Sequence, residues 1–320
     1  MSFQFSGEEI LYATNGHLKS GTISDTRGKV TWNIDEVEMG DWFLAIPSPL
    51  RDPHDCLNLA FERGASGVIV NRRHRYASAS LGGTIITVSD TKTALFDLIR
   101  QWRFRVKPNV VAVSGSFGRR ASMILLAQLL KERFKTHVAF MGNLGWLGSI
   151  NEVLSMPEDT EVLIFEAGAV DRGDIARLGA ALLPNFAVLT QTRHPLHTPE
   201  RDALAAALYC EILETLSEPL DEQVVAAIYD HSEPVRARVD EVLNGSKLTT
   251  SRYSVSGKSS LAHEVAAESL AELSAAMEKV IGQPVTRAEL WCAIETALAL
   301  GVTKAELENV LNLQPLTSVQ

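Results

Sequence analysis

The chain has 320 residues, enough for two ordinary domains, and its 46% hydrophobic and 22% charged residues are typical of a soluble globular protein. A formal net charge of -9 argues against a general nucleic-acid binder, because phosphate contacts need a basic face. No stretch is apolar for long enough to span a bilayer, and residues 1–9 do not resemble a signal peptide. We therefore expect a cytoplasmic protein without membrane insertion.

Short strands and helices alternate along the first hundred residues. Apolar or β-branched runs bounded by turn residues predict strands at 41–47, 66–71 and 83–89. Helical spacing of apolar residues predicts helices at 55–65 and 93–106. The basic run at 72–75 is typical of a solvated loop. This alternation predicts a mixed α/β domain over residues 1–106, with mainly parallel strands.

A second alternating series predicts another domain over residues 107–312. We expect strands at 109–115, 137–142, 161–168, 185–191 and 223–230 and helices at 121–134, 173–183, 199–216, 262–280, 286–298 and 303–312. The run "EVLIFEAG" is apolar up to a carboxylate, as expected of a strand that is buried on both faces. Residues 244–260 read as a loop or weak hairpin, and 313–320 as a disordered tail. The predicted fold is thus α/β, with a central, mainly parallel sheet flanked by helices.

The stretch "VVAVSGSFGRR" at 110–120 has the outline of a phosphate-binding loop. Gly115 and Gly118 follow an apolar strand and precede an apolar helix, so backbone N–H groups could surround a phosphate. A working loop continues with a lysine for the terminal phosphates and a hydroxyl for magnesium. Here Arg119 and Arg120 stand in those places, and Arg120 would put a cation where the metal should bind. The stretch could be a nucleotide site, a damaged one, or an ordinary strand-turn-helix.

Two further loops follow predicted strands in the same way. Glu166 ends one strand, where open α/β folds bind ligands, and is either a metal ligand or a surface residue. His194 and His197 follow the next strand and could be ligands, acid/base groups or loop hydrogen-bonding residues. We expect all three loops to meet at one edge of the sheet. The three cysteines do not have the spacing of a zinc site, and we expect reduced, mostly buried thiols at Cys56, Cys210 and Cys292.

Ordered segments over roughly residues 8–312 resemble the Mur ligase family. The segments "GDWFLAI" and "DPHD" are similar to family segments in the N-terminal domain, and "FEAGAVDRGDIARL" keeps Glu166, Gly168, Gly173 and Ile175 of a central motif. The family's Ser-x-Asp-Ser/Thr-Arg motif is carried by Ser24, Asp25, Thr26 and Arg27.

The resemblance implies that residues 24–27 bind a UDP-MurNAc-peptide precursor and that the central domain binds ATP and magnesium. Family members make an acyl phosphate from ATP and a carboxylate, which an amine then attacks. The positions matching catalytic groups are Arg119, Glu166, His197 and Tyr209, of which Glu166 is a candidate metal ligand. Those matching nucleotide-binding groups are Gly115, Ser116, Gly118, Arg119, Arg120, Asp230 and His263.

Departures from the family pattern fall in several loops. The loop lysine is Arg119, the magnesium hydroxyl is Arg120 and the loop asparagine is Phe117. A carbamylated lysine is replaced by Tyr209, and His197 matches the family histidine only with a shift of one residue. We also expect the third, C-terminal ligase domain to be absent. Because these changes all affect phosphoryl transfer, they favour a degenerate ATP site.

Three hypotheses follow. The first is a non-catalytic pseudoenzyme that acts as a binding or scaffold protein in peptidoglycan precursor metabolism, with a protein partner in cell-wall synthesis. The second is a divergent ATP-dependent amide-bond ligase, in which Arg119 and Arg120 hold the nucleotide and a partner subunit supplies the missing domain. The third is a structural protein that forms homodimers through Leu290 and Trp291, unless these residues belong to the core.

Overall fold

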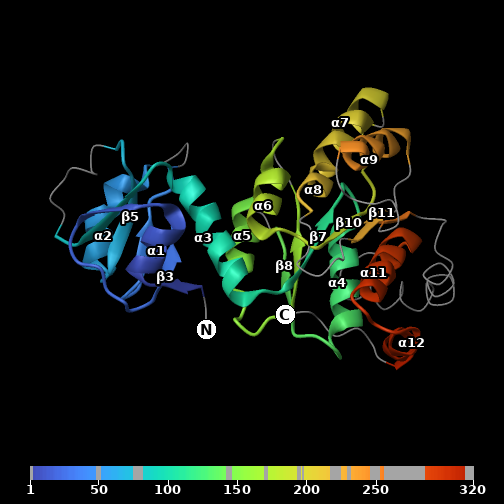
Figure 1. Cartoon of the computed structure of the whole chain (residues 1–320), viewed down its shortest axis with the longest axis horizontal. Helices are drawn as coiled ribbons and strands as arrows, with labels where there is room; N and C mark the ends of the chain where they lie inside the picture. Colours follow the sequence, from blue (N-terminus) through green and yellow to red (C-terminus); the bar gives the residue numbers. More distant parts are fainter. Residues whose placement is uncertain are drawn as a thin grey trace. The chain divides into compact units, whose positions relative to one another are not determined.

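The computed structural model describes residues 3–47, 52–74, 82–141, 146–168, 172–192, 196, 198–216, 225–228, 232–245, 253–255 and 285–313. The chain divides into two compact units (Figure 1). The first consists of Met1–Val106 and Leu154–Glu158, and the second of Lys107–Val153 and Asp159–Gln320. Among the described helices, we find none with the length and apolar character that a bilayer crossing requires.

The first unit contains a six-stranded sheet in the order β1-β3-β4-β5-β6-β2. The four inner strands are parallel, and the two edge strands pair antiparallel. This confirms the expected mainly parallel arrangement. The strands in spatial order are Gln4–Phe5, Gly28–Thr31, Trp42–Leu44, Gly67–Asn71, Thr84–Val88 and His17–Ser20.

Within the described residues of the first unit, three helices and two 3-10 turns accompany this sheet. Helix α1 begins after Ser6, whose hydroxyl accepts from the Glu9 amide at 3.3 Å while the Glu9 carboxylate accepts from the Ser6 amide at 2.8 Å. Helix α1 packs against α3, and α2 packs against β5. The predicted helix at 55–65 is in fact the turn η2 followed by α2. The bounds are Gly7–Thr14 (α1), Ile34–Glu36 (η1), Pro53–Cys56 (η2), Leu57–Glu62 (α2) and Thr91–Val106 (α3).

The second unit contains an entirely parallel six-stranded sheet in the order β12-β11-β10-β7-β9-β8. This confirms the predicted central sheet. Within the stretch expected to be a loop or weak hairpin, residues 253–255 form a strand that pairs parallel with β11, and residues 246–252 and 256–260 lie outside the described residues. The strands are Tyr253–Val255, Val225–Ile228, Phe186–Leu189, Asn109–Ser114, Val162–Glu166 and Thr136–Ala139.

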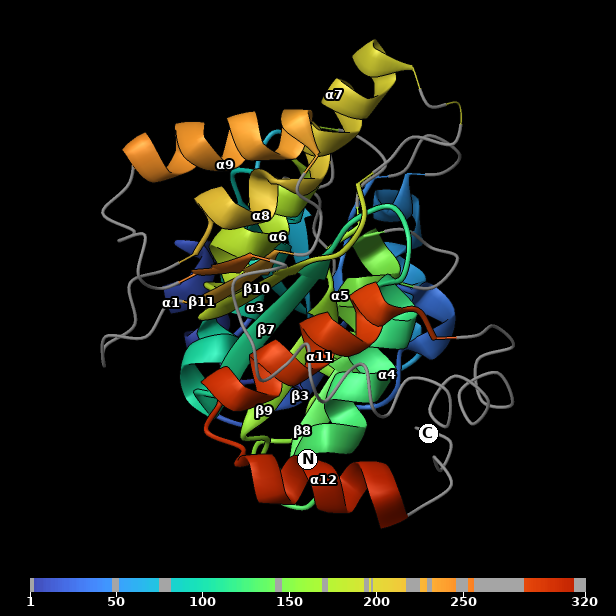
Figure 2. The ribbon, with the colours of Figure 1, turned by 90° about the vertical axis from the view of Figure 1, so that its right-hand side faces the viewer.

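Helices cover both faces of this sheet (Figure 2). Helices α4 and α11 lie side by side on one face, and α6 and α8 lie on the other. The helix predicted at 199–216 divides at Cys210 into α7 and α8. The bounds are Arg119–Leu130 (α4), Trp146–Leu154 (α5), Asp174–Leu182 (α6), Pro199–Tyr209 (α7), Glu211–Glu214 (α8), Glu233–Gly245 (α9), Arg287–Ala299 (α11) and Lys304–Leu313 (α12).

One hydrophobic core of the second unit lies between the sheet and the α4–α11 pair. Leu290 and Trp291 on α11 are fully buried in it, which confirms the interpretation that they belong to the core and removes them as a dimer surface. The three cysteines are buried and are not joined in disulfide bonds, as predicted. The helix predicted at 262–280 and residues 314–320 of the predicted tail lie outside the described residues.

Candidate functional site

The carboxyl ends of three parallel strands meet beside the glycine loop. Val113 of β7 lies opposite Glu166 of β9, and Ser114 of β7 lies opposite Leu189 of β10. In-register parallel strands end at one edge of a sheet, so the loop after Ser114 lies next to Glu166 and to the segment after Leu189. The structure therefore brings together the loops that the sequence placed at this edge.

Close packing requires the two loop glycines. Gly115 and Gly118 have φ values of 134° and 79°, in the region that favours glycine. A Cβ atom on Gly115 would lie 2.2 Å from the Thr190 hydroxyl, and one on Gly118 would lie 2.7 Å from a Glu289 carboxylate oxygen. Both glycines thus have a packing role that is independent of any bound phosphate.

The loop backbone is hydrogen-bonded to the segment after β10. The amides of Ser116 and Phe117 donate to the Gln191 carbonyl at 2.6 and 3.3 Å, and the Ser116 hydroxyl donates to the same oxygen at 2.9 Å. The Thr190 hydroxyl donates to the Phe117 carbonyl at 2.6 Å. Phosphate loops use such amides to hold an anion. Here two of them have a protein acceptor instead.

Arg119 forms an ion pair with Glu166. Its Nε donates to Glu166 Oε1 at 2.9 Å, and a terminal nitrogen donates to the Gly115 carbonyl. The amide of Met141 donates to the other Glu166 oxygen, Oε2, at 3.0 Å. The two side chains are only 17% and 11% exposed. Glu166 is therefore not a solvated surface residue, and the cation in the lysine position is directed at this carboxylate.

Arg120 and Tyr209 have separate contacts. The Arg120 guanidinium carbon lies 4.4 Å from the centre of the Phe140 ring, a cation–π arrangement. The Tyr209 ring lies 5.9 Å from the Arg119 guanidinium carbon, and the Tyr209 carbonyl accepts from the Ser114 hydroxyl at 2.9 Å. Phe117 is 48% exposed. Arg119, Glu166 and Tyr209 are thus brought together, whereas His194, His197, Asp230 and His263 lie outside the described residues.

The segment Ser24–Arg27 is exposed on the first unit. The Thr26 amide donates to the Ser24 hydroxyl at 3.1 Å, and Arg27 donates to both Glu9 oxygens at 2.7 and 3.2 Å. Arg105 also donates to Glu9, at 2.9 Å. Partial burial raises the pKa of Glu9, but the Ser6 amide and the two arginines outweigh it and hold the pKa below its ordinary value of 4.5. The Arg27 side chain is therefore fixed by a local ion pair.

Curated relatives of this chain include ligases that share one name. The chain is 31% identical over 195 residues to UDP-N-acetylmuramoyl-tripeptide–D-alanyl-D-alanine ligase of Rickettsia prowazekii (strain Madrid E), with 59% of this chain and 42% of the relative covered. It is 27% identical over 200 residues to the Bacillus subtilis (strain 168) ligase of the same name, covering 62% and 41%. The chain therefore spans about two fifths of the length of these relatives. No protein-family model matches it.

Solved structures of the same kind share the fold. A crystal structure of MurF from Acinetobacter baumannii superposes with a TM-score of 0.76 at 18% identity, covering 99% of this chain and 68% of that one. The MurF ligase from Thermotoga maritima in complex with ADP superposes with a TM-score of 0.57 at 24% identity, covering 71% and 49%. These structures show the fold alone, because identity is below one quarter.

Proposed function

We propose that this chain, a member of the Mur ligase family whose matched relatives are MurF-type ligases, is a non-catalytic cytoplasmic protein that binds a UDP-MurNAc-peptide precursor. It would act in peptidoglycan precursor metabolism as a binding or scaffold protein. The matched ligases support the ligand class by the name they carry. The contacts at the glycine loop support the loss of catalysis.

The Arg119–Glu166 ion pair carries this proposal. Phosphoryl transfer depends on charge neutralisation by a lysine and magnesium on the phosphates. Arg119 donates hydrogen bonds to Glu166 and to the Gly115 carbonyl, and each Glu166 oxygen accepts a hydrogen bond. Two loop amides donate to the Gln191 carbonyl. Because these residues do not fit ATP with magnesium, we derive no phosphoryl step at this site.

Calorimetric titration of the whole chain with ATP, with and without magnesium, tests the loss of catalysis. We expect no saturable heat in either condition. Magnesium-dependent binding would contradict the proposal. The matched variant carries Arg119→Lys and Arg120→Thr, which restore a compact cation and a hydroxyl. Gain of magnesium-dependent ATP binding by this variant would identify the two arginines as the cause.

A divergent ligase is the second candidate. The glycine geometry of the loop and the position of Glu166 at the end of β9 favour it. In this case Arg119 and Arg120 hold the nucleotide phosphates without magnesium, and a partner subunit completes the enzyme. Saturable ATP binding that is unaffected by chelating magnesium supports this candidate and contradicts the first one.

Precursor binding has its own test. Titration with a UDP-MurNAc-tripeptide should show saturable binding that weakens about tenfold in Arg27→Ala, the loss expected for one charged hydrogen bond. Arg27→Ala also breaks the ion pair with Glu9, so Glu9→Gln is the matched control. If Arg27 contacts the ligand, Glu9→Gln retains binding. Equal losses in both variants would mean that only the ion pair matters, and undiminished binding in Arg27→Ala would remove residues 24–27 from the site.

A further inference from the structure

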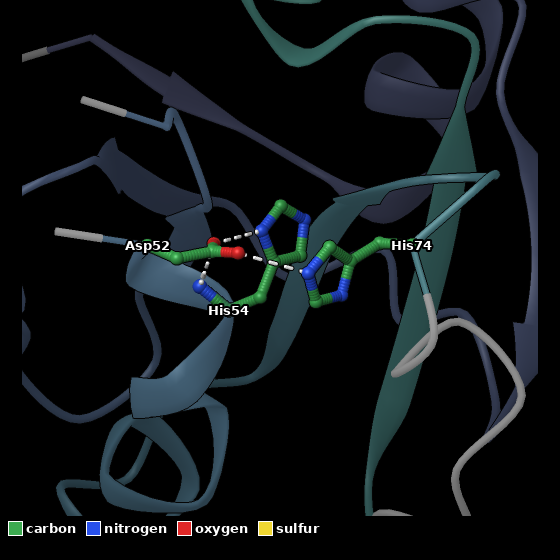
Figure 3. A group of neighbouring side chains, drawn as sticks. All are labelled: Asp52, His54 and His74. Carbon is green, nitrogen blue, oxygen red and sulfur yellow. Dashed lines mark hydrogen bonds and ion pairs between the residues drawn. The ribbon is translucent and has the colours of Figure 1, made fainter. Parts of the chain in front are cut away.

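Two histidines and an aspartate of the first unit gather at the end of β5 (Figure 3). Asp52 precedes the turn η2, His54 lies within η2, and His74 lies in the turn after β5. One ligand atom of each side chain lies within 4.8 Å of the other two. None of these residues belongs to the loop site or to the segment Ser24–Arg27.

The two imidazole rings are stacked and share the carboxylate. Their centres are 3.9 Å apart and their planes differ by 13°. Nδ1 of His54 lies 2.7 Å from Asp52 Oδ1, and Nε2 of His74 lies 2.9 Å from Oδ2. Each ring therefore directs one nitrogen toward the same side chain, and Figure 3 shows the carboxylate facing both rings.

We propose that Asp52, His54 and His74 form a three-ligand zinc site with an open fourth position. Two imidazole nitrogens and one carboxylate are a donor set that zinc prefers, and sites with three protein ligands keep one position for water or another ligand. The His54 side chain is fully buried, whereas those of His74 and Asp52 are 22% and 42% exposed. The open fourth position would thus lie on the side of Asp52 and His74, away from the buried His54.

A metal-free alternative makes a different prediction about one proton. The Asn71 amide donates to Nε2 of His54 at 3.3 Å, so without metal the proton of His54 is on Nδ1. The cluster would then only link η2 to β5 through hydrogen bonds. Zinc on Nδ1 would move this proton to Nε2 and break the bond from Asn71. One amide hydrogen bond contributes far less free energy than zinc coordination, so losing it would not prevent zinc from binding.

The test is a calorimetric titration of the whole, chelator-treated chain with zinc chloride. We expect one zinc ion per chain, and at least a ~100-fold loss of affinity in His74→Gln and in Asp52→Asn, since removal of a ligand should exceed the effect of removing an outer contact. Asp52→Asn retains an oxygen that can accept from the His54 amide. His17→Gln, an exposed histidine of the same unit, is the matched control and should bind zinc like the wild type.

A second measurement is independent of the variants. Nitrogen-15 spectra of the wild type should show the His54 proton moving from Nδ1 to Nε2 with zinc, together with a shift of the Asn71 amide. Absence of zinc binding, equal affinity in all four proteins, or zinc binding with no change at His54 and Asn71 would each overturn the proposal. The cluster would then only link η2 to β5 through hydrogen bonds.

Discussion

Arg119 Nε donates to Glu166 Oε1 over 2.9 Å, across the edge of the central sheet. Arg119 is the first residue of α4, and Glu166 is the last residue of β9. Because both side chains are largely buried, the pair fixes the loop end of the helix to the neighbouring strand. The pair thus has a structural effect that can be measured separately from any ligand.

Glu166→Gln should lower the free energy of unfolding by about 2 kcal/mol, between the small effect of an exposed pair and the larger effect of a fully buried one. The reason is that Arg119 keeps its charge at a site with little water. Denaturant unfolding of the whole chain measures the change. Asp159→Asn breaks a pair with Lys135 in which both side chains are about two thirds exposed, and it should have a much smaller effect. Similar losses in the two variants would contradict a structural role for the Arg119–Glu166 pair.

Gly118→Ala should destabilise the chain more than Gly173→Ala. Both glycines have φ near +80° and both precede a helix, so alanine is strained at either position. Only at Gly118 would the new methyl group meet Glu289, whose carboxylate accepts from the Thr286 amide in the capping box of α11. The free energy of unfolding should fall by about 2 kcal/mol in Gly118→Ala and by about 1 kcal/mol in Gly173→Ala, since a lost helix cap adds ~1 kcal/mol to the backbone strain. Equal losses would show that Glu289 moves aside without cost.

Leu290→Ala should reduce stability without changing the mass of the particle in solution. Removing the buried Leu290 side chain leaves a cavity between α11 and the sheet, and the free energy of unfolding should fall by about 3 kcal/mol. Leu204 on α7 is 61% exposed, and Leu204→Ala is expected to change stability by less than ~0.5 kcal/mol. Denaturant unfolding measures the stability of each variant, and light scattering measures the mass of the particle. A smaller particle in Leu290→Ala would instead support a dimer surface.

Much of the fold was predictable where the hydrophobic pattern was strong. The strands at β5, β6, β7, β9 and β10 are β-branched or apolar runs, and their burial on both faces agrees with a parallel sheet. By contrast, the exposed edge strand β2 has the polar sequence "HLKS" and carries no alternation that would reveal it. Helix α5 contains Gly148 and Ser149, which weaken a helix signal. The break at Cys210 has no glycine or proline to indicate it.

The candidate site was predictable in its strands but not in its contacts. Sequence placed Gly115, Gly118 and Glu166 at one edge, because each follows or ends an apolar run. It did not predict that the Gln191 carbonyl accepts from the loop amides or that Glu289 lies against Gly118, since both depend on tertiary packing. The pairing of His54 with His74 was also missed. Twenty positions and the strand β5 separate the two histidines, and His74 lies within a basic run that is typical of a solvated loop.

The ion pairs of Glu9 should make the first unit less stable in acid. As the pH falls, the unfolded carboxyl group takes up its proton near its ordinary pKa of 4.5, before the folded one, whose pKa is lowered. The unfolded state then binds more protons, so the stabilisation present above about pH 4.5 is lost as the pH falls toward the folded pKa. Glu9→Gln removes this contribution, and its thermal unfolding should depend less on pH between about 5 and 3 than that of the wild type.

Calorimetric melting of both proteins at several pH values in this window measures the difference. Other carboxylates with lowered pKa values, such as Asp52, act in the same direction, so the informative quantity is the difference in melting temperature between wild type and variant. That gap in melting temperature should narrow as the pH falls. Arg27→Gln removes one partner of Glu9 but leaves Ser6 and Arg105, and it should give an intermediate pH dependence. A gap that is constant with pH would mean that the arginines do not stabilise the ionised form of Glu9 in the folded chain.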